Sequence, residues 1–244
     1  MKPHDSLADS PIRTSRANRS SEGPDKTASL CIVVPVKSPE LAKQRLSPAL
    51  NHQQREVLAK HLYQYTLGYL QQHFSDYDLL VVSEDSKVLA KAERLGCLTL
   101  RQTAGRGLNA AMEQAASEVC RLGYKSLLML PIDLAFLTEQ ELSQVIRRGQ
   151  DQDVVVAIAN DGGTNALLVQ PPNGIRFRFG LDSARAHQRE AIKANLKFSA
   201  LALPLMALDI DQEMDLYSAT AANSHALTGL TETDMTGIGG KRYA

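Results

Sequence analysis

The chain has 244 residues, and its 27 Lys and Arg residues balance its 27 Asp and Glu residues. That length suits one α/β domain with terminal extensions, and the absence of net charge gives no support for binding to nucleic acid or to a membrane surface. No apolar run reaches the roughly 18 residues of a membrane span, and no signal-like stretch opens the chain, so we expect a cytoplasmic protein that binds small molecules. The sequence leaves the oligomeric state open, a homodimer included.

The three cysteines argue against both a disulfide framework and a structural zinc site. Cys31, Cys97 and Cys120 are far apart, odd in number and outside any CxxC spacing. We expect each to be a small buried apolar residue.

The two ends of the chain differ in composition from its centre. Residues 1–29 are rich in Ser, Arg, Asp and Pro, and residues 221–244 are small, polar and rich in glycine. Such segments bury too little apolar surface to offset their ordering entropy, so we expect a disordered N-terminal tail and a flexible C-terminal tail. Residues 30–220 form the predicted domain.

Within that domain, short apolar runs alternate with amphipathic stretches, which is typical of βα units. We therefore expect an α/β fold of three layers, α/β/α, around a mostly parallel sheet. In chain order, the predicted elements are a strand at 30–36, a helix at 53–73, a strand at 77–82, a helix at 86–95, a strand at 97–101, a helix at 108–121, a strand at 126–130, a helix after 138, strands at 153–159 and 165–170, a helix from 182 or 183 to 195, a strand at 197–203 and a helix after 211.

Several of these elements carry their own start and stop signals. Asn51 is placed to cap the first helix, and Thr138 forms a capping box with Glu141. Gly96 and Gly123 stand where a left-handed residue would end a helix.

In open parallel sheets, ligands bind at the carboxyl ends of the strands, so the residues after each strand are candidates for a site. After the first strand, Pro35 is followed by Lys37, Lys43 and Arg45, three cations within nine residues that can neutralise a polyphosphate. A solvated basic loop is the alternative interpretation.

A glycine-rich loop at residues 105–110 joins the third strand to a helix. Gly105 and Gly107 let backbone amides approach a ligand, and the amide of Asn109 suits a nucleobase edge. The loop also matches G-x-G-x-x-A, so an NAD(P)-dependent oxidoreductase is the main alternative function. A plain strand-to-helix turn is a further interpretation.

Acidic residues follow two of the predicted strands. Asp133 comes directly after a hydrophobic run, and a carboxylate there, shared with phosphate oxygens, suits magnesium. Asp209 and Asp211 offer a partner, since alternate residues of a strand end face the same side. Asp133 as a turn residue and Asp211 as a helix cap are the structural alternatives.

A fourth region suits a second anion. Thr164, Gly180 and Ser183 offer hydroxyl groups and a bare amide near a helix start, where the first N–H groups have no partner inside the helix. Glycine turns and serine caps are common, so a purely structural role is the alternative.

Taken in order, these motifs resemble the phospholactate guanylyltransferase family, whose fold is similar to that of the molybdenum-cofactor nucleotidyltransferases. The resemblance covers residues 30–216. The segments that carry it are Pro-Val-Lys at 35–37, Ala-Lys-Gln-Arg-Leu at 42–46, Gly-Leu-Asn at 107–109, Leu-Pro-Ile-Asp-Leu at 130–134, Asp-Gly-Gly-Thr-Asn at 161–165 and Phe-Gly-Leu-Asp-Ser at 179–183.

The resemblance implies a Rossmann-like fold of the nucleotide-diphospho-sugar transferase kind. It also implies transfer of a guanylyl group from GTP to 2-phospholactate, phosphoenolpyruvate or 3-phosphoglycerate, with release of pyrophosphate, in biosynthesis of coenzyme F-420. Mg²⁺ is the implied cofactor. Another nucleotidyltransferase of the same fold and a non-catalytic nucleotide-binding module remain alternatives.

The resemblance further implies what individual residues do. Catalysis falls to Lys37, Lys43 and Asp133. The implied binding residues are Pro35, Lys37, Lys43, Arg45, Gly105, Gly107 and Asn109 for the nucleotide, Thr164, Gly180 and Ser183 for the acceptor, and Asp133 with Asp209 or Asp211 for the metal.

Two positions depart from the family pattern. Ala135 stands where relatives usually carry proline, and Gln212 with Glu213 replaces a Thr-Pro pair. The second departure leaves open which of Asp209 and Asp211 binds the metal.

Overall fold

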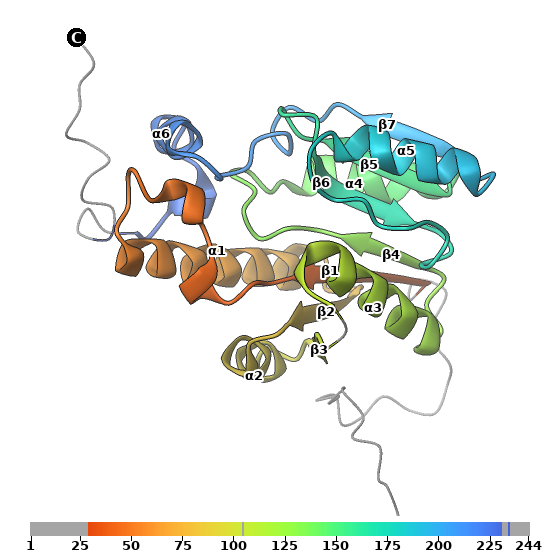
Figure 1. Ribbon diagram of the computed structural model, residues 1–244, viewed down its shortest axis with the longest axis horizontal. Coiled ribbons are helices and arrows are strands. Elements are labelled where there is room, and N and C mark those ends of the chain that lie inside the picture. Colours follow the sequence, from red (N-terminus) through yellow and green to blue (C-terminus); the bar gives the residue numbers. More distant parts are fainter. Residues whose placement is uncertain (1–28, 104, 231–233, 235–244) are drawn as a thin grey trace, which may run out of the picture.

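The computed structural model describes residues 29–103, 105–230 and 234, and it is built around one seven-stranded sheet (Figure 1). The strands are β1 Leu30–Pro35, β2 Asp78–Ser83, β3 Leu98–Arg101, β4 Ser126–Met129, β5 Val154–Ile158, β6 Thr164–Val169 and β7 Phe198–Leu201. Their order is β3-β2-β1-β4-β6-β5-β7, and β6 runs antiparallel to both of its neighbours. The other pairings are parallel, which confirms the predicted mostly parallel sheet.

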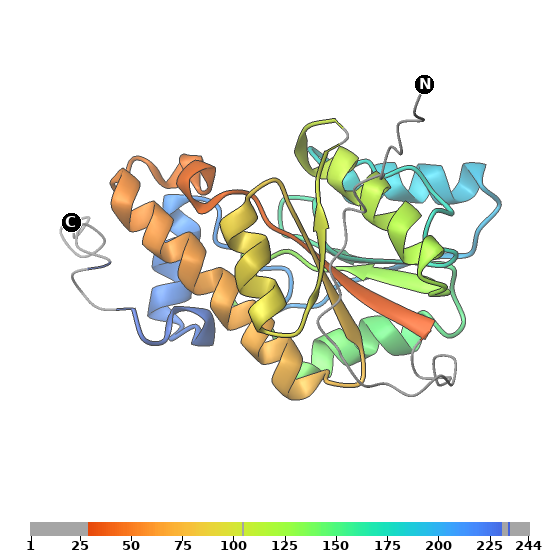
Figure 2. The same cartoon turned by 90° about the horizontal axis from the view of Figure 1, so that it is seen from below.

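Helices cover both faces of this sheet, which confirms the three-layer prediction. The helices are α1 His52–His73, α2 Ser86–Arg94, α3 Gly107–Arg121, α4 Glu139–Arg148, α5 Ser183–Lys193 and α6 Glu213–Ala221. One face is covered by α1, α2 and α4, and the other by α3 and α5 (Figure 2). None of the helices in the described residues is both long and apolar enough to cross a lipid bilayer.

Strand β1 shows why its sequence is apolar throughout. Ile32 and Val34 pack toward the face of α1, whereas Cys31 and Val33 pack toward the face of α3. Both faces are buried from Leu30 to Val34, which explains why these positions carry no polar side chain. Cys31 is buried as expected, and the structure records it as a free thiol.

The local signals at the helix ends act as the sequence predicts. The Asn51 side chain accepts from the N–H of Gln54 at 2.9 Å, and Thr138 caps α4. Gly96 and Gly123 have φ values of 77° and 89°, in the left-handed region that favours glycine, so α2 and α3 end there.

A third apolar cluster lies beside the sheet and joins α1 to α6. We call it the loop cluster, because it also receives residues from the loops that follow β1, β4 and β7 and from the segment after α6. Its buried members are Leu46, Leu50, Leu58, Leu62, Ala135, Ile210, Leu216, Ala219 and Ala226.

The segment after α6 differs from the flexible tail expected beyond residue 220. Residues 225–227 form a short 3-10 helix that packs against α1, and Ala226 is fully buried. The hydroxyl of Ser224 donates to the carbonyl of Ala135. A few apolar residues suffice to dock this segment despite its polar composition. Residues 1–28 of the predicted N-terminal tail and residues 231–233 and 235–244 of the predicted C-terminal tail lie outside the described residues.

The cap of α1 gives a direct test of the fold. Asn51→Ala removes the oxygen that accepts from Gln54, so we expect the free energy of unfolding to fall by about 1 kcal/mol in urea unfolding. Gln53→Ala, at an exposed position in the same turn, is the control and should change it by less than about 0.5 kcal/mol. Equal losses in both variants would contradict the capping role.

Candidate active site

Two loops far apart in sequence are joined backbone to backbone at the carboxyl edge of the sheet. The N–H of Ile210 donates to the carbonyl of Asp133 at 2.8 Å, and an isolated antiparallel bridge pairs Leu134 with Asp209. The structure therefore brings Asp133 and Asp209 together.

The electrostatics of Asp209 reflect this closeness. Burial and the neighbouring carboxylate of Asp133 raise the pKa of Asp209 to about 6, while a hydrogen bond from Asn165 and the charge of Lys43 act in the opposite direction. Two carboxylates held this close favour a cation between them, because a positive charge relieves their repulsion.

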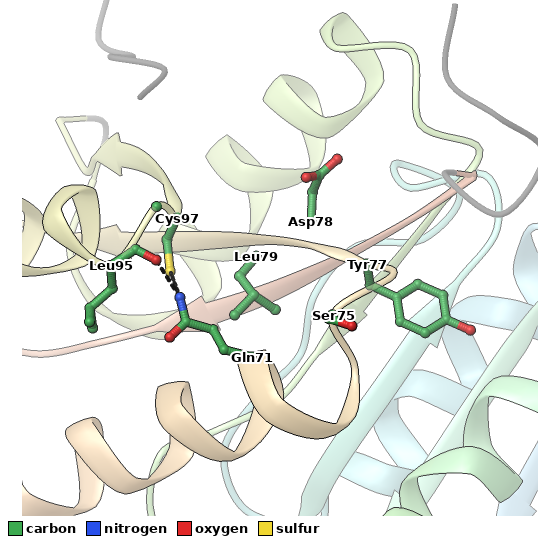
Figure 3. Close-up of a pocket in the computed structure, with 8 residues that line it drawn as sticks. Gln71, Ser75, Tyr77, Asp78, Leu79, Leu95 and Cys97 are labelled. Atoms are coloured by element: carbon green, nitrogen blue, oxygen red, sulfur yellow. Dashed lines mark hydrogen bonds between the residues drawn. The ribbon is translucent and has the colours of Figure 1, made fainter. Parts of the chain in front are cut away.

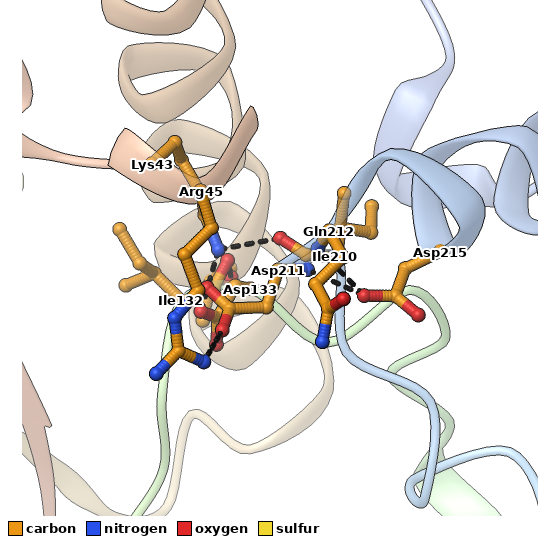
Figure 4. A network of polar contacts seen from close by, with 9 residues as sticks. Lys43, Arg45, Ile132, Asp133, Ile210, Asp211, Gln212 and Asp215 are labelled. Atoms are coloured by element: carbon orange, nitrogen blue, oxygen red, sulfur yellow. Dashed lines mark hydrogen bonds and ion pairs between the residues drawn. The ribbon is translucent and has the colours of Figure 1, made fainter. Parts of the chain in front are cut away.

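Lys43 supplies such a charge from within the chain (Figure 4). Its ammonium donates to Oδ2 of Asp133 and to the carbonyl of Ile210, both at 2.6 Å, and its side chain is only 6% exposed. The backbone of Lys43 is left-handed, with φ of 54°, which is costly for a residue with a side chain. The buried ion pair offsets that strain and holds the loop in place.

The second acid of the Asp209–Asp211 motif has a different partner. Nη1 of Arg45 donates to Oδ2 of Asp211 at 2.6 Å, and both side chains are partly solvent-exposed. The N-cap of α6 is Gln212, and the carboxylate of Asp215 accepts from the N–H groups of Asp211 and Gln212. Asp211 therefore does not cap the helix, and the two acids of the motif face different cations.

A small cavity connects these acids to the turn between β5 and β6. Its volume is about 80 Å³. It is lined by Arg45, Asn160, Asp161, Ala207, Leu208, Asp209, Asp211, Gln212 and Asp215. The basic loop, the Asp209–Asp211 motif and the turn that contains Asp161 thus meet around one cavity.

The loop that leads to Asp209 is held by residues whose role the sequence did not reveal. The carboxylate of Glu141 accepts from the N–H groups of Leu205 and Met206, at 3.1 and 2.6 Å, and Asn165 donates to the carbonyl of Met206 at 2.9 Å. The capping-box prediction is thus right for the backbone of Glu141, which Thr138 caps, whereas the Glu141 side chain serves this distant loop.

The predicted acceptor residues gather at the start of α5. The hydroxyl groups of Thr164 and Ser183 lie 3.0 Å apart, and both residues are buried. Gly180, with φ of 135°, is exposed three residues before Ser183. The N–H of Ala184 donates to the carbonyl of Gly162, which ties the helix to the turn after β5.

His187 completes this group and was not predicted. It is fully buried, its Nε2 accepts from the N–H of Arg178 at 3.0 Å, and its Nδ1 lies 3.2 Å from the hydroxyl oxygen of Thr164. Because Nε2 must offer a lone pair, the proton sits on Nδ1 and is donated to Thr164. One helical turn separates His187 from Ser183, and that spacing was the available signal.

The predicted nucleotide residues lie on two loops. Gly105 and Gly107 have φ values of 69° and 82°, so the loop before α3 depends on both glycines. Asn109 uses its amide on the backbone of Phe179, and Lys37 is exposed just after β1, whose last residue is Pro35. The loop follows β3, an edge strand, rather than the central first strand that carries a dinucleotide fingerprint.

A larger cavity lies at the opposite edge of the sheet, where β2 and β3 begin (Figure 3). Its volume is about 170 Å³, and among the described residues that line it Asp78 is the only charged one. Asp78 already accepts from the hydroxyl of Tyr124 at 2.6 Å. The cavity offers no cation to a triphosphate, and we place the site at the carboxyl edge.

Comparison with known proteins finds a family model and several relatives that match most of the chain. Residues 30–223 match a family model described as "Guanylyl transferase CofC like". A 3-phospho-D-glycerate guanylyltransferase of Colwellia psychrerythraea is 38% identical over 76% of this chain and 88% of its own length. A 2-phospho-L-lactate guanylyltransferase of Methanothermobacter thermautotrophicus is 34% identical over 76% and 82%. A phosphoenolpyruvate guanylyltransferase of Rubrobacter xylanophilus is 34% identical over 77% and 92%.

Solved structures show the same fold at low sequence identity. A protein described as a nucleotide-diphospho-sugar transferase, from Desulfovibrio desulfuricans, superposes with a TM-score of 0.61 at 18% identity and covers 86% of this chain and 93% of its own. A 4-diphosphocytidyl-2C-methyl-D-erythritol synthase from Anaerococcus prevotii gives 0.55 at 10% identity, with 81% and 96% covered. The predicted nucleotidyltransferase fold is confirmed.

Burial of His187 predicts how stability depends on pH. Burial lowers the pKa of His187 from 6.5 to about 4. Above 6.5 neither state is protonated there. As the pH falls toward 4, His187 becomes protonated in the unfolded state but stays neutral in the folded state. The free energy of unfolding therefore falls by at most about 1.4 kcal/mol per pH unit.

Urea unfolding of the wild type and of His187→Gln, near pH 7 and near pH 5, measures this effect. The wild type should lose about 2 kcal/mol more than the variant between the two conditions. Parallel losses in both proteins would show that His187 is not held neutral by the fold.

Proposed function

The chain belongs to the family of guanylyl transferases like CofC, and on that premise we propose that it moves the guanylyl group of GTP onto the phosphate of a small phosphorylated carboxylic acid. It is a nucleotidyltransferase, as are its relatives, and the nicotinamide alternative for residues 105–110 is not supported. The observation that carries the proposal is the convergence of Lys43, Asp133 and Asp209 at the carboxyl edge of the sheet.

The proposed acceptor is 2-phospholactate, phosphoenolpyruvate or 3-phosphoglycerate, the acids named for the three relatives. Each combines a phosphate with a carboxylate on a short carbon chain. Thr164, Ser183 and the N–H of Gly180 are the groups that would bind one of these anions, at the start of α5, where the helix dipole favours negative charge. On this proposal the enzyme serves the biosynthesis of coenzyme F-420.

Asp133 and Asp209 are the residues that would hold Mg²⁺. Their chemistry fits the ion, because carboxylate oxygens are the ligands that magnesium prefers and a cation, the Lys43 ammonium, already sits on Asp133. No group of three or more His, Cys, Asp or Glu with metal-binding geometry occurs among the described residues. Magnesium takes one or two protein carboxylates and completes its shell with phosphate and water, so two acids are enough to hold it. Asp211 forms an ion pair with Arg45, and we do not assign it to the metal.

The reaction requires little from the chain beyond placement and charge. An oxygen of the acceptor phosphate attacks the α-phosphorus of GTP, and the bond from that phosphorus to the bridging oxygen of pyrophosphate breaks. The acceptor phosphate, with a second pKa of about 6, is largely dianionic at neutral pH, so no general base is needed. Bound magnesium would supply positive charge to the phosphate oxygens. Lys37, Lys43 and Arg45 would hold the triphosphate in line for attack and oppose its charge.

Pyrophosphate release tests the activity directly. The purified chain is incubated with GTP, Mg²⁺ and each of the three acids in turn. We expect pyrophosphate and a guanylylated product with at least one acid, and no release when the acid is omitted. Absence of release with all three acids would refute the proposed reaction.

Variants of the acids test the assigned roles. Asp133→Asn and Asp209→Asn should each lower kcat by a factor of about 100 or more, because each removes a carboxylate that would hold the magnesium ion opposite the phosphates, whereas Asp211→Asn should cost about tenfold or less. Asp151→Asn, at an exposed position after α4, is the control. A loss in Asp211→Asn that exceeds the loss in Asp209→Asn would reverse the assignment. Thermal unfolding of each variant checks that the fold survives.

A further inference from the structure

The segment that leads into α5 is held by side chains rather than by a neighbouring strand. We call residues 177–179 the anchor segment, and it belongs to no strand or helix. Three consecutive backbone N–H groups donate hydrogen bonds to side chains of α3 and α5. The bonds run from Phe177 to Oε1 of Glu113 at 3.0 Å, from Arg178 to Nε2 of His187 at 3.0 Å and from Phe179 to Oδ1 of Asn109 at 2.7 Å.

Asn109 makes the most complete of these contacts. Besides accepting from the N–H of Phe179, its Nδ2 donates to the carbonyl of Phe179 at 3.1 Å. Its amide therefore satisfies both polar groups of one backbone residue, as a neighbouring strand would. The amide oxygen and nitrogen that could bond to a nucleobase edge are therefore both bonded to the protein backbone.

The position of Phe179 affects the residues next to it at the start of α5. Gly180 has φ of 135° and Asp182 has φ of 54°, and Ser183 then begins α5. Gly180 can adopt its conformation because it lacks a side chain, whereas the left-handed backbone of Asp182 is costly and has to be held by its surroundings. The ring of Phe179 also meets His187 edge-on, with centroids 4.8 Å apart, and His187 contacts Thr164.

We infer that Asn109 is a positioning residue for the acceptor site rather than a residue that contacts guanine. It ties α3, which begins at the glycine loop, to the segment that sets Gly180 and Ser183. The inference rests on the proposed acceptor role of those residues and deepens it.

The same helix offers a matched control. Further along α3, Gln114 donates to the carbonyl of Arg101 at 3.0 Å and accepts from the N–H of Thr103 at 3.0 Å. This is the same kind of amide contact, but it holds the backbone that leads into the glycine loop. Gln114→Ala therefore removes an equivalent contact on the nucleotide side.

Initial rates of the wild type, Asn109→Ala and Gln114→Ala are measured twice, with varied acid at saturating GTP and Mg²⁺ and with varied GTP at saturating acid. In Asn109→Ala, KM for the acid should rise about fivefold to tenfold, and KM for GTP should stay within about twofold, since the two lost hydrogen bonds act on the acceptor side. Gln114→Ala should leave KM for the acid within about twofold.

Other outcomes overturn the inference. A rise in KM for GTP alone in Asn109→Ala would make Asn109 a nucleotide contact, and no change in either KM, or equal rises in both variants, would remove its positioning role. If the wild type transfers no guanylyl group, the proposed function fails. Hydrogen exchange over residues 177–187 then decides the anchor separately: faster exchange in Asn109→Ala than in Gln114→Ala supports it, and equal exchange refutes it.

Discussion

Burial of three apolar residues is the constraint on which the site depends. Leu46, Ala135 and Ile210 enter the loop cluster, and each lies within two positions of a charged residue of the site. Acidic groups that converge repel one another, and exposed ion pairs contribute little stability. The apolar neighbours supply the free energy that holds these loops together, and the Lys43 ammonium then compensates the acids at the point where the loops meet.

The backbone adds a second restraint at the same place. The N–H of Ala135 donates to the carbonyl of Leu208 at 2.8 Å. Proline at this position would have no such hydrogen, so alanine permits a backbone bond beside the bridge between Leu134 and Asp209. This bond reinforces the pairing of the two acidic loops.

Local patterns in the sequence predicted most of the helices and strands, and the rule for parallel sheets placed the charged loops at the correct edge. What they did not predict are partners chosen across the fold. The Glu141 carboxylate accepts from Leu205 and Met206 because that irregular loop has N–H groups to satisfy. The role of His187 depends on its contact with Thr164 of β6, which forms only when α5 packs on the sheet. The partners of Asp209 and Asp211 likewise depend on which loop each acid faces.

The reversed direction of β6 has a consequence for how such a site can diversify. An all-parallel sheet would bring only strand ends to this edge, each followed by a crossover helix, whereas the hairpin of β5 and β6 brings a strand beginning, with Thr164 and Asn165, to the same rim. A hairpin is anchored on both sides of its turn. On the proposed acceptor role of Thr164, side chains of this hairpin would set the shape of the acid site, while the half of the molecule built from β1, β2 and β3 keeps its geometry.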